Sequence, residues 1–163
     1  MINARLKRVA LTLVGSSLLV GAFVGPAFAA EDNGTTTATV SSMISVVAPA
    51  TIAFGAGVPN ETLSALDSVV TVITNNGAGY TLSVQGSDMT KTTNTIPLTA
   101  LSFRNGVTAY APLVAVATDV LLVNVTAETD ADGTDHLIDA QLVLPFVEAG
   151  DYAGTFIFTA SVN

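Results

Sequence analysis

The feature that most constrains this chain is a strict alternation of apolar and polar side chains. In residues 151–162 most odd positions are polar, whereas the even positions are Tyr152, Gly154, Phe156, Phe158, Ala160 and Val162. Successive side chains of a strand point to opposite faces, so this alternation predicts a strand with one buried face. The same alternation occurs in residues 80–85 and 138–146, and no stretch shows sustained helical periodicity.

Further segments rich in Val, Ile, Thr and Leu are predicted to be strands, and they span residues 38–47, 51–54, 69–74, 97–103 and 119–127. Turn signals made of Gly, Asn, Pro and Asp separate them. Short strands with this punctuation favour an all-β fold, an antiparallel β-sandwich of about seven to nine strands. A closed barrel is the alternative.

The amino terminus is typical of a secretory signal peptide. Three of the five basic residues lie in the first eight positions, residues 9–24 are almost wholly apolar, and Pro26 precedes Ala27-Phe28-Ala29. We therefore predict a signal peptide over residues 1–29 that is cleaved after Ala29. A retained membrane anchor is the alternative, and the Gly-Pro break and the cleavage pattern argue against it.

The predicted mature chain begins with a flexible leader, residues 30–37, followed by a single domain, residues 38–163. Its two basic and thirteen acidic residues leave a formal charge of −11, and it contains no Cys. Nucleic-acid binding is excluded because no basic face is available for phosphates. Without disulfides, an exported domain must be stabilised by its own core. We expect an extracellular or cell-wall-associated protein with no stable membrane span after processing.

Little in the sequence suggests catalysis. The single histidine, His136, lies in a predicted acidic turn and is expected to be solvated, and no nucleophile motif accompanies it. No Gly-rich loop leads into a helix that would bind phosphate. We therefore predict that the protein is not an enzyme.

One acidic loop has nearly the spacing of a calcium site. The residues in question are Glu128, Asp130, Asp132 and Asp139, at relative positions 1, 3, 5 and 12, with Gly133 at position 6. The loop departs from the usual pattern at both ends, and its flanks resemble strands. The alternative is a solvated hairpin tip whose Asp and Gly residues favour a turn. No other cofactor is indicated.

Residues 69–90 resemble the first signature of the WxL-domain proteins of Gram-positive cell surfaces. In that signature a Val-Thr-Val strand leads through an Asn and Gly turn into Gly-Trp-x-Leu-x-Val, here Gly79-Tyr80-Thr81-Leu82-Ser83-Val84. Residues 150–160 resemble the second signature. Both signature tryptophans are replaced, by Tyr80 and Phe158, and the second Leu is Ala160. The chain thus resembles a divergent member of the family.

The resemblance implies a secreted β-sandwich that associates non-covalently with the cell wall, through peptidoglycan, or with partner surface proteins. It marks Tyr80, Leu82 and Phe158 as candidate binding residues. The alternation places Tyr80 and Leu82 on the apolar face of their strand, which favours a role in the core. An alternative function is a subunit of an extracellular fibre or matrix, which would self-associate when the leader of one copy completes the sheet of the next.

Overall fold

The computed structural model describes residues 36–163. The predicted signal peptide, and residues 30–35 of the predicted leader, lie outside the described residues. Residues 39–163 form one compact unit. Among the residues described, no helix is long and apolar enough to cross a membrane.

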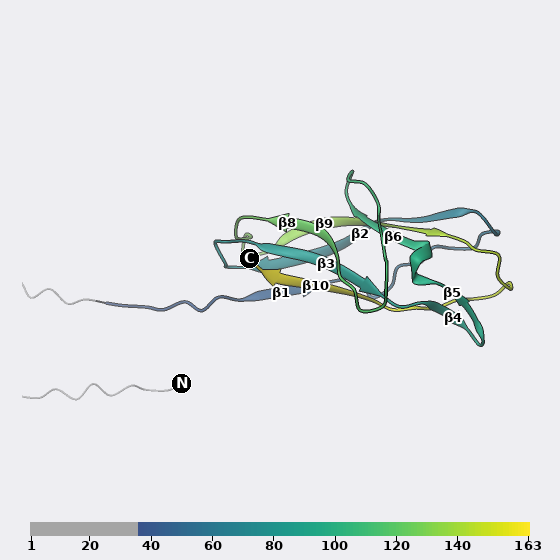
Figure 1. Ribbon diagram of the computed structural model, residues 1–163. Coiled ribbons are helices and arrows are strands. Elements are labelled where there is room, and N and C mark those ends of the chain that lie inside the picture. The colour runs from purple at the N-terminus through teal and green to yellow at the C-terminus, as the bar shows by residue number, and fades with distance from the viewer. Residues whose placement is uncertain (1–35) are drawn as a thin grey trace, which may run out of the picture. The chain divides into compact units, whose positions relative to one another are not determined.

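Ten strands and one 3-10 turn make up the described chain (Figure 1). They are β1 (Ile44–Val47), β2 (Thr62–Thr74), β3 (Tyr80–Gly86), β4 (Met89–Lys91), β5 (Asn94–Ile96), the turn η1 (Leu98–Ala100), β6 (Leu101–Asn105), β7 (Ala111–Pro112), β8 (Val120–Val125), β9 (Thr134–Val143) and β10 (Phe156–Val162). The count exceeds the predicted seven to nine because of three very short strands, β4, β5 and β7.

The strands form two main antiparallel sheets. The larger sheet has the order β1-β2-β9-β6-β7 and the smaller one β10-β3-β8, while β4 and β5 form a separate hairpin. One hydrophobic core draws side chains from both main sheets, among them Val70, Leu82 and Ile138. These features confirm the predicted antiparallel β-sandwich, and separate sheets of this kind do not make a closed barrel.

The buried positions follow the alternation for which the strands were predicted. In β3 the buried residues are Tyr80, Leu82 and Val84, and in β9 they include Ile138, Ala140 and Leu142. Burying each large apolar side chain contributes about 1.5–3 kcal/mol, and no disulfide assists the core. The sandwich is therefore held by the inward faces of its strands.

Several predicted strand boundaries are wrong. Residues 51–54 form no strand, β1 begins only at Ile44, and residues 98–100 form a 3-10 turn instead of continuing a strand. Strand β2 begins at Thr62, well before the predicted start at residue 69, and β10 begins at Phe156 instead of residue 151. The strands begin and end where a neighbouring strand is available for pairing. The strand propensity of a local segment carries no information about that neighbour.

Strand β2 contains a bulge. Its pairing with β9 shifts between Ala65 and Ser68, and Asp67 lies in the left-handed region with φ of 55°. The backbone N–H of Asp67 donates to Oδ1 of Asp139 at 2.9 Å. A carboxylate on the neighbouring strand therefore holds the bulge in place.

Candidate functional site

The three residues marked by the family resemblance lie in the core. Tyr80 and Leu82 are 0% exposed and Phe158 is 9% exposed. The ring of Phe158 packs edge-on against Phe103, with centroids 6.3 Å apart. Tyr80 and Leu82, buried in this way, stabilise the sandwich and present no surface to a wall polymer in the folded domain.

His136 is not solvated, contrary to the expectation from its acidic neighbours. It lies in β9, is 7% exposed, and its Nε2 is 2.6 Å from the hydroxyl oxygen of Tyr80. The two rings meet edge to face, with centroids 5.8 Å apart. The even spacing of His136 with Ile138 and Ala140 is the signal that would have placed it on the inward face.

Burial shifts the pKa of both partners. It raises the pKa of Tyr80 above its ordinary value of 10.0, and a side-chain hydrogen bond with Thr134 opposes that shift. It lowers the pKa of His136 below its ordinary value of 6.5, and the charge of Asp135 opposes that shift. Both shifts favour the neutral forms, so the pair is a neutral hydrogen bond inside the core.

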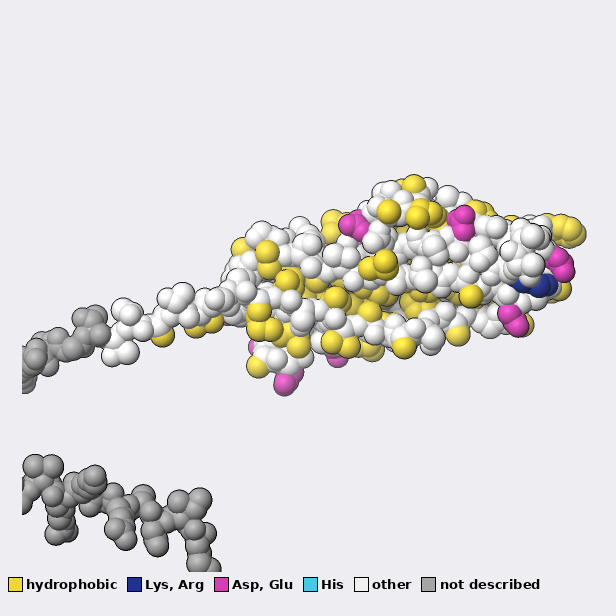
Figure 2. All heavy atoms as spheres, turned by 90° about the horizontal axis from the view of Figure 1, so that it is seen from below, with side chains coloured by type: hydrophobic (Ala, Val, Ile, Leu, Met, Phe, Trp, Pro, Cys, Tyr) yellow, Lys and Arg dark blue, Asp and Glu magenta, His cyan; other side chains and the backbone are white. Residues whose placement is uncertain are grey.

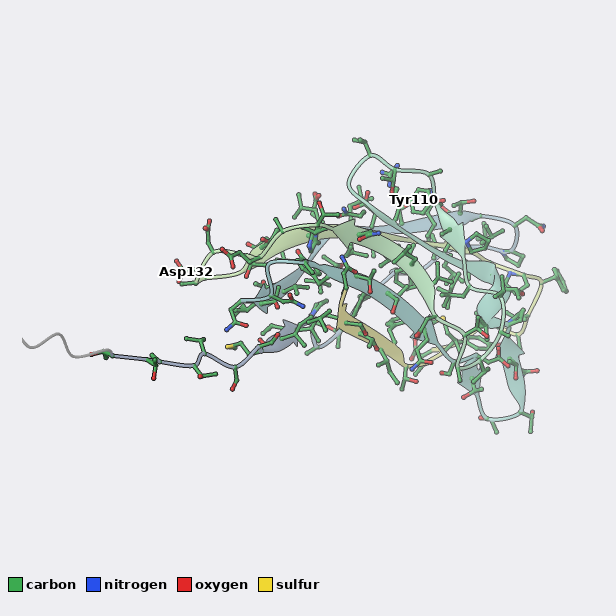
Figure 3. All side chains as sticks on the ribbon, turned by 60° about the vertical axis from the view of Figure 1, so that its left-hand side comes forward. Tyr110 and Asp132 are labelled. Atoms are coloured by element: carbon green, nitrogen blue, oxygen red, sulfur yellow. The ribbon has the colours of Figure 1, made fainter. Side chains whose placement is uncertain are left out.

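The four residues of the predicted calcium loop do not come together. Asp130 and Asp132 lie in the turn before β9, which the N–H of Gly133 closes by donating to the carbonyl of Asp130 at 2.9 Å, and Figure 3 shows Asp132 at the tip of that loop. Asp139 lies inside β9, where it is bonded to Asp67 and Arg104. Within residues 36–163, no group of three or more His, Cys, Asp or Glu side chains could hold a metal ion.

Sequence reasoning missed the ion pair that occupies Asp139. The Nη2 atom of Arg104 lies 2.7 Å from Oδ2 of Asp139, and its Nε donates to the same oxygen at 2.8 Å. The guanidinium also stacks on Tyr110, 4.4 Å from the ring centroid. The sequence does contain an indication of this ion pair, because Arg104 is the only arginine in the predicted mature chain. The pair is a structural clamp between β6, β9 and the bulge of β2.

An apolar groove is the feature of the described residues best suited to a partner. It has a volume of about 1120 Å³ and lies between residues 48–57, the segment after β1, and residues 144–156, the segment before and at the start of β10. Its floor is made by core residues of both sheets, including Leu63, Leu142 and Phe158. Seen from below, the domain exposes hydrophobic side chains along a seam (Figure 2).

Several polar groups at the rim of the groove are hydrogen-bonded to neighbouring residues. The Tyr152 hydroxyl donates to the carbonyl of Glu148 at 2.8 Å. The Glu148 carboxylate in turn accepts from Lys91 at 3.3 Å and from Asn94 at 2.6 Å. Phe146, by contrast, lines the groove and is 90% exposed. Part of the polar rim is thus engaged in hydrogen bonds, while the exposed Asp151 also lines the groove and most of the other lining side chains are apolar.

Comparisons with known proteins do not name a family. The chain matches no protein-family model, and a comparison with characterised proteins finds no match. The resemblance to WxL domains therefore stays a prediction, based on the residues given above.

Proposed function

We propose that the protein is a secreted, non-catalytic component of the Gram-positive cell surface that associates non-covalently with the wall or with partner surface proteins. The apolar groove supports this proposal most strongly, because a hollow of about 1120 Å³ with an apolar floor is suited to binding. The predicted signal peptide supports an extracellular location.

The chemistry of the groove favours a protein partner over peptidoglycan glycan. A sugar chain presents many hydroxyl groups, and each one that is buried needs a hydrogen-bond partner. Most of the residues that line the groove are Ala, Pro, Gly, Leu and Phe. Extended polypeptide carrying small apolar side chains matches this lining better, since its backbone can pair with strand edges.

The buried polar residues support a non-catalytic role. A general base must reach a proton on its substrate. His136 instead faces Tyr80, and Asp139 is bonded to Arg104 and Asp67. Among the described residues, every buried side-chain nitrogen and oxygen has a hydrogen-bond partner. These groups are satisfied within the fold.

Co-sedimentation with purified walls tests the proposal. The chain produced from residue 30 should sediment with untreated walls. Most of this binding should be lost when the walls have been stripped of protein. Ile52→Asp, which puts a charge at the groove, should reduce binding, whereas Val107→Asp, at a fully exposed loop position, should not. Equal binding to stripped walls would show that the wall polymer is the partner. No binding to either preparation would overturn the proposal.

A second candidate function is a subunit of an extracellular fibre or matrix assembled by strand addition. One observation favours it specifically: β1 pairs only with residues 71–74 of β2, so the first part of β2 has a free edge among the described strands.

A further inference from the structure

The sandwich lacks a strand on one side. Residues 62–70 of β2 pair with β9 on one edge, and no described strand pairs with their other edge. Strand β10 is the edge of the smaller sheet, and β1 lies beside it without forming a ladder in the described chain. The groove opens between these two free edges, since Leu63 of β2 and Phe156 of β10 both line it.

Residues 48–57, here called the strap, cover this opening only loosely. No backbone group of the strap is hydrogen-bonded to another described residue. Two of its side chains, Ile52 and Phe54, are half-buried against the core, while most of the rest of the strap is exposed Ala, Gly and Thr. Unpaired backbone beside an apolar hollow is what an added strand would satisfy.

We propose that the groove accepts residues 36–40 of a second copy of this chain as an added β-strand. The proposal rests on the second candidate function and names its donor and acceptor. The donor segment, Thr-Thr-Ala-Thr-Val, is exposed throughout and forms no strand in its own domain. Ala38 and Val40 alternate with polar residues, so both side chains face the groove when the segment is extended.

Donation does not disrupt the donor's own domain. The hydrogen bonds that hold this segment to its own domain begin only after the donor residues, at Ser41, whose carbonyl accepts from Asn75 at 2.9 Å, and at Met43, whose N–H donates to Asn75 at 2.7 Å. Val40 is 82% exposed and so contributes little to its own core. The donor residues are thus tethered at one end and free to pair elsewhere.

Length and charge also fit. Five extended residues span about 17 Å, enough to run along the regular part of the free β2 edge, which spans about 13 Å. The bulge at Asp67 interrupts that edge, so the regular ladder covers residues 62–65. The donor carries no charge, which avoids adding to the repulsion between two acidic domains. Because donor and acceptor are different surfaces, each copy can bind the next and the assembly stays open.

Light scattering and negative-stain microscopy of the chain produced from residue 30 test the proposal. We expect concentration-dependent oligomers or filaments for the natural sequence. Val40→Asp should raise the concentration needed for assembly at least tenfold, because it places a charge in the apolar groove. Val107→Asp makes the same change at a loop residue that is 100% exposed, and it should assemble like the natural sequence.

A mixing experiment separates donor from acceptor. Val40→Asp removes the donor and Ile52→Asp blocks the acceptor, so neither variant should polymerise alone. When the two variants are mixed, they should form a one-to-one complex, and no assembly of more than two copies should appear. A natural chain that stays monomeric up to about millimolar concentration, or a Val40→Asp variant that assembles normally, would overturn the proposal. Binding of the monomeric Val40→Asp variant to untreated walls would show that the surface association stands independently.

Discussion

The two ends of the sandwich are built from the same strands but are completed to different degrees. At the closed end, where β1 covers residues 71–74 of β2, the Thr74 hydroxyl donates to the carbonyl of Met43 at 2.7 Å and Tyr80 meets His136. At the open end, the strap passes over the core without backbone hydrogen bonds to described residues and leaves the groove. Whether an end of the sandwich is closed therefore depends on how far β1 extends along β2.

The sequence explains why β1 stops. Pro49 has no N–H to donate and disfavours continuation of the ladder, and Gly55 has φ of 75°, which does not belong to a strand. The strap therefore carries strand-like side chains, Ile52 and Phe54, between two residues that prevent pairing. If the closed end stabilises the fold and the open end binds a partner, substitutions at the closed end should reduce stability, whereas substitutions at the open end should leave stability nearly unchanged.

The largest difference should come from the aromatic side chains. Tyr80→Ala leaves a cavity in the closed end and breaks the bond with His136, so it should lower the free energy of unfolding by about 3–5 kcal/mol. Phe146→Ala, at the open end, should change it by less than about 0.5 kcal/mol. Chemical denaturation measures both. Equal costs would contradict the distinction between the two ends.

A glycine pair tests the closed end at the level of the backbone. Gly79 has φ of 86°, and a Cβ atom there would collide with the backbone carbonyl of Val125. Gly79→Ala should therefore cost about 2–3 kcal/mol. Gly77→Ala, two residues earlier with open space around it, should be nearly neutral. Thermal melts of the two variants compare them directly, and a stable Gly79→Ala would show that the turn relaxes freely.

The two ion pairs provide a smaller contrast. Asp139→Asn removes the charge that faces Arg104 and weakens the bond to the bulge, and we expect a loss of about 2 kcal/mol. Glu148→Gln, which disrupts the exposed pair with Lys91 at the groove rim, should cost less than about 0.5 kcal/mol. Denaturation at low and high salt would distinguish them, since screening affects mainly the exposed pair. A larger loss for Glu148→Gln would reverse the assignment.

The smallest effect concerns pH. Burial lowers the pKa of His136, so the unfolded chain takes up a proton at a higher pH than the folded domain does. The contribution of His136 is complete above its ordinary pKa of 6.5, and stability declines as the pH falls below that value. Unfolding midpoints from pH 8 to pH 5 should fall more for the natural protein than for His136→Gln. A parallel dependence in both would contradict the buried neutral pair.

The sequence predicted those strands whose alternation is uninterrupted. In β3 and in residues 156–158 of β10, parity alone identified the inward residues, as Leu82 and Phe158 show, whereas Val162, also placed inward by the alternation, is 45% exposed. It failed in β2, where the bulge changes parity: Leu63 is buried at an odd position, and Val70 and Val72 are buried at even ones. Because the bulge interrupts the period-two pattern, the sequence of β2 resembles two separate segments, and only the second, residues 69–74, was predicted to be a strand.

The site was less predictable than the fold. The three motif residues were placed correctly on the apolar face, but the calcium loop was not assembled, because Asp139 lies five residues inside β9 beside Arg104. The groove could not be predicted from sequence. It arises because two strand edges meet without a strand between them, and this depends on pairings far apart in the chain.

Hydrogen exchange resolved by peptide tests the central claim most directly. In the monomer, we expect the strap to exchange at the rate of an unstructured peptide, while β3 and β9 exchange only through global unfolding. In assembled protein, residues 36–40 and residues 62–65 should gain protection together. A strap as protected in the monomer as β3 would contradict an open end to this sandwich.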